Sequence, residues 1–361
     1  MLQDLFNLTQ LIAAQDKCDY QRIYGFGELS VKVKSNSEAL LDELDLYYKS
    51  YVSSSNDESG KTLYVINQEN IGHEHDWLDV PREAGKQGKK EGYLENAEGG
   101  RWIKKFKTGL TLLQHKSTPT VVGECEQQLA QIVNFINNQC LNHYLSQGFE
   151  LGHASAFSRD GKVTAIAAGS GGGKSTLMLR CLEDDARKFL TNDRLLFKNE
   201  NGKVSAVGIA KLPRVNPGTL LNAQRLKHIL PVQRQTELEK MPISELWGLE
   251  EKYDVQIEDE YGLGRVVLQG ELVNLVMLDW ALSSDEPTAL LPVDLSVEAE
   301  EIDGLRKRPG PFFQDSNGVF SEDLNELASL SQYCQALAPI NVYRLTGKID
   351  FDRAFELLEA L

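Results

Sequence analysis

A glycine-rich loop that leads into a lysine and a serine is the part of this sequence best equipped for chemistry. Residues 168–175 read Ala-Gly-Ser-Gly-Gly-Gly-Lys-Ser. Small residues allow successive backbone N–H groups to curl around phosphate oxygens, because no Cβ stands in the way. Lys174 then supplies a positive charge for the β- and γ-phosphates, and the hydroxyl of Ser175 is a ligand for Mg²⁺. The loop therefore predicts a binding site for a nucleoside triphosphate.

The loop departs from the strict pattern G-x-x-x-x-G-K-[ST] at one position, because Ala168 replaces the first glycine. Its surroundings nevertheless fit. The apolar run 163–168 suits a buried strand, and residues 175–184 suit a helix that packs on that strand and directs its N-terminus at an anion. This context favours phosphate binding over a flexible turn that binds nothing. The residues expected to contact the nucleotide are Gly169, Ser170, Gly171, Gly172, Gly173, Lys174, Ser175 and Thr176.

Composition limits the classes of partner. The chain has 361 residues and a formal net charge of −15. Such an acidic chain argues against a general nucleic-acid partner and against an anionic membrane surface, since both would be repelled. Its five cysteines are scattered without a C-x-x-C pair, which indicates reduced thiols. With neither a basic leader nor a stretch of about 20 apolar residues, we expect a soluble cytoplasmic protein.

Hydrophobic periodicity predicts two domains. The pattern of strands and a helix in residues 1–122 predicts a smaller α+β domain. We expect this domain to bind the acceptor or to have a regulatory role. Residues 123–361 alternate helices and strands and predict an α/β nucleotide-binding domain. The principal expected elements are strands 28–33, 154–157, 163–168, 195–197, 275–278 and 340–345, helices 37–51, 124–146, 175–184 and 350–361, and an exposed loop at 53–60.

Three features together resemble the HPr kinase/phosphorylase family, and most closely the bacterial HprK-related kinase B proteins. His153 precedes Lys174 by 21 residues, which is the spacing of a histidine in that family. The loop follows the family's G-x-S-G-x-G-K-S version, and Asn192-Asp193 falls where the family has paired acidic residues. The resemblance is best over residues 150–200. It implies a P-loop kinase core of the HPr kinase/PEP carboxykinase type.

The resemblance also implies roles for single residues. Lys174 and Ser175 would hold phosphate and Mg²⁺, Asp193 would be the metal ligand or the catalytic base, and His153 would lie beside the transferred phosphoryl group. The position of Asp193 just beyond a strand of an α/β sheet independently favours a ligand-binding role. An isolated histidine in an apolar setting, by contrast, is usually a core residue. The family's assembly into oligomers implies a homo-oligomer here.

Two departures concern the acceptor side of the expected site. Asn192 replaces the first acidic residue, so one carboxylate remains there. Lys211 and Arg214 occupy the region where the family has a glutamate. They either contact a phosphate or an acidic acceptor, or are simply solvent-exposed residues of a loop. Both departures indicate an acceptor other than HPr.

Other charged segments favour structural interpretations. Asp279 ends an apolar run and could face Mg²⁺, but a buried strand ending in a turn is favoured. Residues 306–311 favour an exposed turn over a loop that covers the site. Residues 82–107 carry eight Lys or Arg against four Glu, and a solvated basic loop is favoured over an anion site. His73 and His75 resemble metal ligands, but no complete ligand set accompanies them.

These observations predict an ATP-dependent kinase that uses ATP and Mg²⁺. Its acceptor would be a hydroxyl group on a protein serine or a small molecule, which the sequence does not identify. The alternative is an ATP-binding regulatory or scaffold protein with little transfer activity. Asn192 favours the alternative, whereas Asp193 and His153 favour the kinase.

Overall fold

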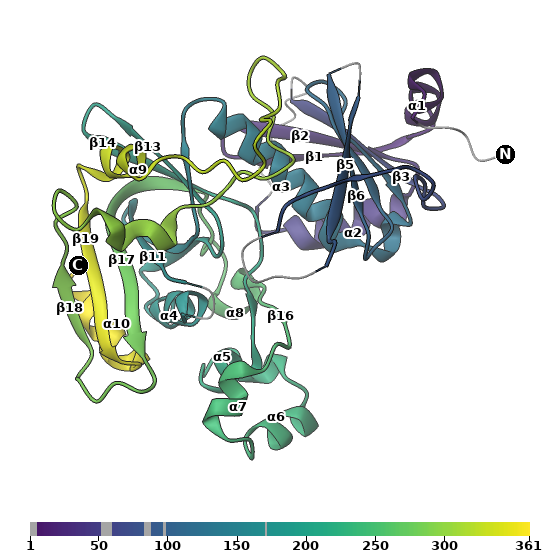
Figure 1. Ribbon diagram of the computed structural model, residues 1–361. Coiled ribbons are helices and arrows are strands. Elements are labelled where there is room, and N and C mark those ends of the chain that lie inside the picture. Colours follow the sequence, from purple (N-terminus) through teal and green to yellow (C-terminus); the bar gives the residue numbers. More distant parts are fainter. Residues whose placement is uncertain (1–5, 52–59, 83–87, 97–98, 170–171) are drawn as a thin grey trace. The chain divides into compact units, whose positions relative to one another are not determined.

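The computed structural model of this protein describes residues 6–51, 60–82, 88–96, 99–169 and 172–361 (Figure 1). The chain folds into two compact units. The first unit contains residues 1–148 and 308–327, and the second unit contains residues 149–307 and 328–361. Both units combine sheets with helices, so the expected α/β class is confirmed. In the described residues, no helix is both long and apolar enough to cross a bilayer.

The first unit is built on an eight-stranded sheet with the order β1-β2-β3-β8-β7-β6-β5-β4. The predicted strand at 28–33 and helix at 37–51 are present as β2 and α2, and Ser37 caps α2 by accepting a hydrogen bond from Leu40 N. The loop expected at 53–60 lies largely outside the described residues. The strands are β1 Tyr20–Phe26, β2 Leu29–Ser35, β3 Lys61–Asn67, β4 Leu78–Asp79, β5 Glu91–Asn96, β6 Gly100–Lys105, β7 Thr111–Gln114 and β8 Thr120–Gly123, and the helices are α1 Leu8–Gln15, α2 Glu38–Tyr48, the short η1 Cys125–Gln127 and α3 Leu129–Leu145.

Helix α3 belongs to the first unit, so the division differs from the domain boundary expected at residue 122. The helix buries Ile132, Phe135 and Ile136 and packs on β2 and α2. An apolar helix face must be covered, and this sheet covers it. The sequence showed the helix itself but not which neighbours bury it.

A returning segment, residues 308–327, completes the first unit. Buried Arg101 holds it, donating hydrogen bonds to the carbonyl oxygens of Pro311 at 3.4 Å and Ser321 at 3.2 Å. The guanidinium also lies 4.4 Å from the ring centroid of Phe320. Asn142 of α3 donates a further hydrogen bond to Phe312 O at 2.8 Å.

The basic segment at 82–107 is only in part the solvated loop that the sequence favoured, because Arg82, Lys89 and Lys90 are exposed outside strands but the residues from Glu91 onward are mostly in strands. Residues 83–87 and 97–98 lie outside the described residues, while most of the remainder forms β5 and β6. Lys104 is buried, donates a hydrogen bond to Gly109 O at 2.6 Å, and has its pKa lowered by burial to about 8. Ion pairs join Lys89 to Asp79 at 2.9 Å, Lys105 to Glu91 at 2.5 Å and Arg101 to Glu95 at 2.6 Å.

The second unit is built on a nine-stranded sheet, ordered β12-β10-β11-β17-β14-β13-β9, with β19 paired to β17 and β18 paired to β19. β11, β17 and β19 are mutually parallel, so their carboxyl ends meet at one edge. The strands are β9 Glu150–Gly152, β10 Ala154–Arg159, β11 Lys162–Ala167, β12 Arg187–Thr191, β13 Leu195–Glu200, β14 Lys203–Gly208, β17 Gln269–Ala281, β18 Ala289–Pro292 and β19 Asn341–Lys348.

Helices cover this sheet. α4 follows β11 directly and contacts both β10 and the C-terminal helix α10. The expected terminal helix is α10, and Asp350 caps it by accepting a hydrogen bond from Arg353 N at 2.9 Å. The principal helices are α4 Lys174–Cys181, α9 Leu330–Leu337, α10 Phe351–Glu359 and the 3₁₀ helix η3 Ala299–Leu305.

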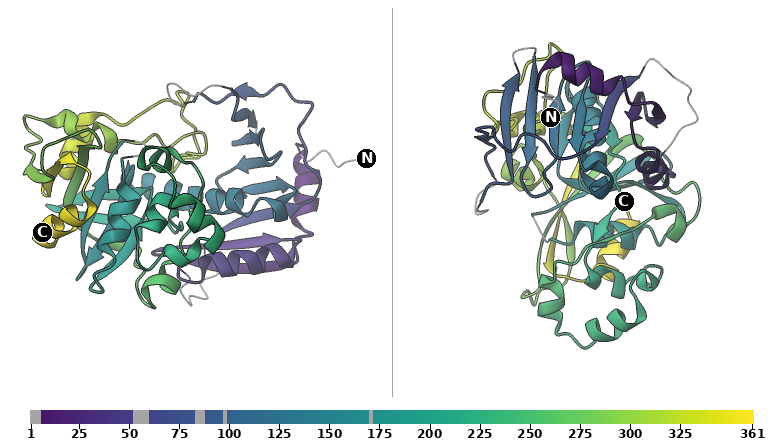
Figure 2. Two further views of the ribbon diagram at one scale, coloured as in Figure 1. Left: turned by 90° about the horizontal axis from the view of Figure 1, so that it is seen from below. Right: turned by 90° about the vertical axis from the view of Figure 1, so that its right-hand side faces the viewer.

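A helical insertion, residues 214–254, leaves and rejoins the second unit through a two-stranded ladder of β15 (Arg214–Val215) and β16 (Tyr253–Asp254). Its three α-helices gather in one small cluster in every view (Figure 2). The ladder is followed by the short helix α8 (Ile257–Tyr261). The insertion contains α5 Pro217–Leu221, the 3₁₀ helix η2 Lys227–Ile229, α6 Val232–Leu238 and α7 Ile243–Gly248.

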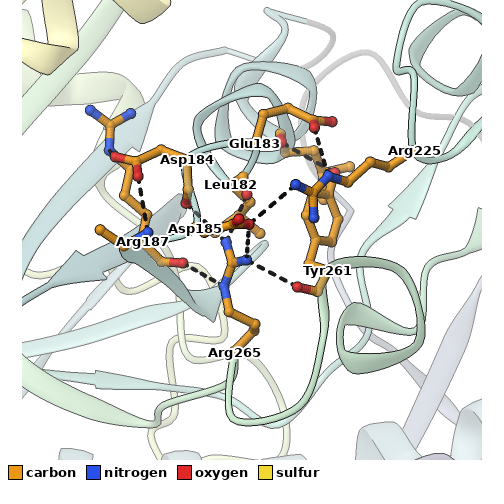
Figure 3. Close-up of polar contacts among 10 residues, drawn as sticks. Leu182, Glu183, Asp184, Asp185, Arg187, Arg225, Tyr261 and Arg265 are labelled. Carbon is orange, nitrogen blue, oxygen red and sulfur yellow. Dashed lines mark hydrogen bonds and ion pairs between the residues drawn. The ribbon is translucent and has the colours of Figure 1, made fainter.

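Arg265 anchors the end of α4 and the turn that follows it (Figure 3). Its side chain is buried, and all three guanidinium nitrogens donate hydrogen bonds. Four acceptors are backbone carbonyls and one is a carboxylate, so a single side chain satisfies groups from three segments. The acceptors are Arg187 O at 2.8 Å, Asp185 Oδ1 at 3.0 Å, Tyr261 O at 3.0 Å, Leu182 O at 2.7 Å and Asp184 O at 3.0 Å.

We expect Arg265→Met to lower the free energy of unfolding by about 2–4 kcal/mol, because it removes the donors to four backbone carbonyl groups, three of them in buried hydrogen bonds. Urea denaturation measures this loss. Arg159→Met is the matched control, since Arg159 is half exposed and reaches Asp184 at 4.0 Å, and it should cost less than about 0.5 kcal/mol. Equal effects of the two substitutions would contradict the anchoring role of Arg265.

Candidate functional site

The glycine-rich loop lies between the carboxyl end of β11 and the first residue of α4, as the sequence predicted. Ser170 and Gly171, both expected nucleotide contacts, lie outside the described residues. Gly172 N donates a hydrogen bond to Gly169 O at 3.2 Å, which closes the loop upon itself. The Trp280 indole at the end of β17 donates to Gly172 O at 2.9 Å. Gly172 is therefore held from the neighbouring strand.

Two glycines in the loop cannot be replaced without cost. A Cβ on Gly172 would lie 2.6 Å from the Cβ of Ala168, so the residue that departs from the strict pattern itself requires glycine here. Gly173 has a φ of 90°, a left-handed conformation, and its Cβ would lie 3.2 Å from the ring of Phe351 in α10. At both positions glycine is required because neighbouring protein atoms leave no room for a Cβ.

Lys174 begins α4 with its side chain folded back along the loop. The residue is buried, and Nζ donates a hydrogen bond to Ala168 O at 3.3 Å. Burial lowers the pKa of its ammonium group, although the nearby charge of Asp193 opposes this by raising it. Lys307 lowers the same pKa further. The sequence favoured an exposed turn at 306–311, yet the charge of Lys307 acts on Lys174.

His153 and Asp193 face each other at the strand ends. His153 stands between β9 and β10, and its Nε2 lies 3.4 Å from Oδ1 of Asp193, which follows β12. The His153 backbone N–H donates to Leu305 O at 2.6 Å, which fixes the start of β10. His153, 21 residues before Lys174, thus contacts the same carboxylate whose charge reaches Lys174.

Positive charge surrounds the Asp193 carboxylate. Burial alone would raise its pKa, but the hydrogen bond from His153 and the charges of Arg194 and Lys211 outweigh burial. The pKa of Asp193 is therefore well below its ordinary value of 3.8, and the group is ionised at neutral pH. Arg194 Nε lies 3.6 Å from Oδ2 of Asp193.

Backbone contacts fix the turn that carries Asp193. The Ser155 hydroxyl on β10 donates to Asn192 O at 2.6 Å, and the Thr191 hydroxyl donates to Arg194 O at 2.8 Å. Asn192 is held through its backbone oxygen, and its side-chain Oδ1 accepts from the same serine at 3.5 Å. The amide therefore points toward β10, and Asp193 is the residue of this pair that faces His153 and Lys174.

Lys211 and Arg214 occupy different surroundings. Burial lowers the pKa of Lys211, while the charge of Asp193 opposes this by raising it, so Lys211 lies on the carboxylate side. Arg214 is half exposed and forms an ion pair with Asp254 at 3.0 Å across the β15–β16 ladder. Lys211 therefore lies near Asp193, whereas Arg214 joins the two strands of the ladder and also lines the cavity beside residues 172–176.

Two cavities adjoin the loop, both within the second unit. The smaller, of about 380 Å³, lies between Ala168, Gly169, the end of β17 and η3, and carries four carboxylates, namely those of Asp279, Glu298, Glu300 and Glu301. Asp279 pairs with Thr346 inside a strand that continues to Ala281, so it does not stand in the turn that the sequence favoured. The larger cavity, of about 630 Å³, lies between residues 172–176 and the helical insertion.

The site offers oxygen donors of the kind that Mg²⁺ takes as ligands. Among the described residues, no three His, Cys, Asp or Glu side chains converge on one point. His73 and His75 therefore belong to no such group. His75 instead packs its ring 4.3 Å from that of Phe6. Mg²⁺ usually binds through one or two carboxylates together with substrate phosphates. Ser175 and Asp193 are the residues that could hold it in that way.

Sequence reasoning missed several residues that shape the site. Trp280 reaches Gly172 from 108 positions away, and Thr219 bonds Thr176 through their hydroxyl groups at 2.7 Å from 43 positions away. Neither has a local motif. Trp280 directly follows the Asp279 noted in the sequence, so the run at 275–279 was the one available signal.

We expect Gly172→Ala to lower the free energy of unfolding by about 1–3 kcal/mol, because its methyl group would overlap that of Ala168. Introducing Ala168→Gly into the same protein should recover most of the loss. Urea denaturation of the two single variants and the double variant forms the cycle that measures the coupling. Additive effects would show that the two positions do not contact each other.

The lowered pKa of Asp193 sets a pH dependence of stability. Its folded pKa lies below the unfolded value of 3.8, so its contribution is present above about pH 4 and is lost as the pH falls further. At neutral pH, Asp193→Asn leaves Arg194 and Lys211 without their carboxylate and should be less stable than the parent protein. Urea denaturation between about pH 7 and pH 3 should show this difference shrinking as the pH falls, whereas a constant difference would contradict the shifted pKa.

The comparisons with known proteins found a likeness to solved structures but no match to a family model or a curated protein. No model of a known protein family matches the chain. No curated protein matches it either. Among solved structures, the chain is similar to the Hpr(Ser) kinase/phosphatase from Coxiella burnetii, with 15% sequence identity and a TM-score of 0.30 over 59% of this chain and 87% of that one. The roles of individual residues therefore rest on the geometry of the site.

Proposed function

We propose that this protein is an ATP-dependent phosphotransferase that uses Mg²⁺ and transfers the γ-phosphoryl group to a hydroxyl acceptor. One observation carries the proposal. An ionised carboxylate, Asp193, stands at a strand end, where its charge reaches the lysine at the start of α4 and a histidine touches it. Phosphoryl transfer requires a phosphate cradle, a positive charge and a carboxylate at the nucleophile, and these residues supply all three.

Each residue has a distinct task in the proposed reaction. The loop N–H groups and the N-terminus of α4 bind phosphate oxygens, and Lys174 neutralises charge that develops on the transferring group. Its lowered pKa reflects a desolvated ammonium group, whose attraction for phosphate is stronger than in water. Mg²⁺ would add positive charge between the phosphates, with Ser175 and Asp193 as its protein ligands. His153 would lie beside the transferred group.

The strongly lowered pKa of Asp193 bears on its role with the acceptor. A carboxylate this acidic is a weak base on its own. Phosphoryl transfer passes through a loose transition state, however, so the acceptor hydroxyl needs orientation more than early deprotonation. Arriving phosphate charge raises the pKa of a nearby carboxyl group, while Mg²⁺ held by Asp193 would lower it. Asp193 therefore orients the hydroxyl and takes its proton late, while Lys211 contacts the acceptor or its phosphate.

The proposal is tested with γ-labelled ATP and cell extract. Lys174→Ala should weaken ATP binding about tenfold or more, whereas Asp193→Asn should leave binding within about threefold and lower label transfer about 100-fold or more. Asp160→Asn is the matched control, because Asp160 occupies the β10–β11 turn at the opposite end of β11. It should transfer label normally.

Two results would overturn the kinase proposal. Normal transfer by Asp193→Asn removes this carboxylate from the reaction. Tight ATP binding by the parent protein with no labelled acceptor favours the alternative, an ATP-binding regulatory or scaffold protein. The specific observation behind that alternative is Asn192, whose amide provides no second carboxylate and is turned toward Ser155.

A further inference from the structure

We propose that the 630 Å³ cavity beside the glycine-rich loop holds the ribose and base of the nucleotide, and that the helical insertion forms the part of the site that recognises the nucleoside. This inference rests on the proposed function and deepens it. It assigns phosphate recognition to β11 and α4, and nucleoside recognition to residues 214–254, which are separate in the sequence.

The position of the cavity fixes which end of the nucleotide it can take. Its lining includes residues 172–176, the last part of the loop and the first turn of α4. Neither Asp193 nor His153 lines it. The acceptor must approach the carboxylate, so this cavity is left for the nucleoside end of the nucleotide. A phosphate chain that crosses the N-terminus of α4 would then extend from the nucleoside in the cavity to Asp193.

The chemistry of the lining suits a nucleoside. Apolar side chains contribute one part of the wall, among them Leu221, Leu246 and Phe351, and offer surface to a flat base. Asn222 and Thr219 contribute amide and hydroxyl groups that can bond to ribose hydroxyls or base edges. A volume of about 630 Å³ lies within the range of small-molecule sites, which are mostly apolar with a few polar groups.

The insertion is joined to the loop helix by direct bonds. The hydroxyl of Thr219 in α5 bonds that of Thr176 in α4 at 2.7 Å. The Arg214–Asp254 ion pair, at 3.0 Å, bridges the two strands through which the insertion leaves and returns. The far wall is made by Ile349 and Phe351 at the start of α10, and Phe351 also packs beside Gly173. A ligand in the cavity would therefore contact the first turn of α4.

The test compares ATP with inorganic tripolyphosphate, which has the phosphates but no nucleoside. Asn222→Trp places a large side chain in the cavity mouth, because Asn222 is exposed and lines the cavity. Titration calorimetry should show about a tenfold or greater loss of ATP affinity, with tripolyphosphate affinity changed less than about twofold. Gln224→Trp is the matched control, since Gln224 is exposed on the same segment but does not line the cavity. It should bind both ligands normally.

Leu246→Trp, which fills the cavity from α7, should reproduce the selective loss and guards against a folding defect specific to the first variant. Photolabelling with 8-azido-ATP should attach label within residues 172–176, 214–252, 282 or 349–351, which contain the lining of the cavity. Unchanged ATP affinity in both cavity variants, equal loss of both ligands, or label elsewhere would overturn the nucleoside assignment. Unchanged ATP affinity with lost transfer would instead place the acceptor in the cavity. A parent protein that binds neither ATP nor tripolyphosphate would overturn the proposed function itself.

Discussion

The second unit depends on how helix α4 is held at its two ends. The direction of its N-terminus decides where the peptide dipoles and the loop N–H groups point. At the C-terminal end, Arg265 gathers the carbonyl groups of the α4–β12 turn and of the end of α8. At the N-terminal end, Trp280 holds Gly172 and Phe351 packs on Gly173. A short helix of eight residues has little stability of its own, so these tertiary contacts must supply it.

The electrostatics of the site follow from the same arrangement. Lys174 and Lys211 are both buried enough for their pKa values to fall, and both approach the one carboxylate that remains ionised between them. Near Asp193, these two lysines outnumber the one carboxylate, whereas four carboxylates line the smaller cavity beside Ala168 and Gly169. The positive charge that could meet a polyphosphate is therefore local to Lys174 and Lys211, in a chain that is strongly acidic as a whole.

Local signals in the sequence identified the elements that carry their own pattern. The apolar run of β11, the glycines after it and the Asp350 cap of α10 were each legible, because their causes lie within a few residues. The insertion was not predicted, since α5, α6 and α7 have five to seven residues and give no apolar stripe long enough to show a period. Within the site, the approach of His153 to Asp193 followed from a family resemblance, whereas Trp280 and Thr219 act across long sequence separations that no local pattern records.

The returning segment gives the chain an order of assembly. Arg101 lies in a strand made early in synthesis, but the carbonyl groups that accept its hydrogen bonds belong to Pro311 and Ser321. Most of the second unit must therefore be synthesised before the first unit can be completed. Until then, the guanidinium of Arg101, which is buried in the folded protein, lacks those acceptors. Phe135, which packs against Phe312, also lacks that contact. Folding of the N-terminal sheet is thus coupled to the emergence of residues some 200 positions later, so neither unit corresponds to a contiguous piece of the gene.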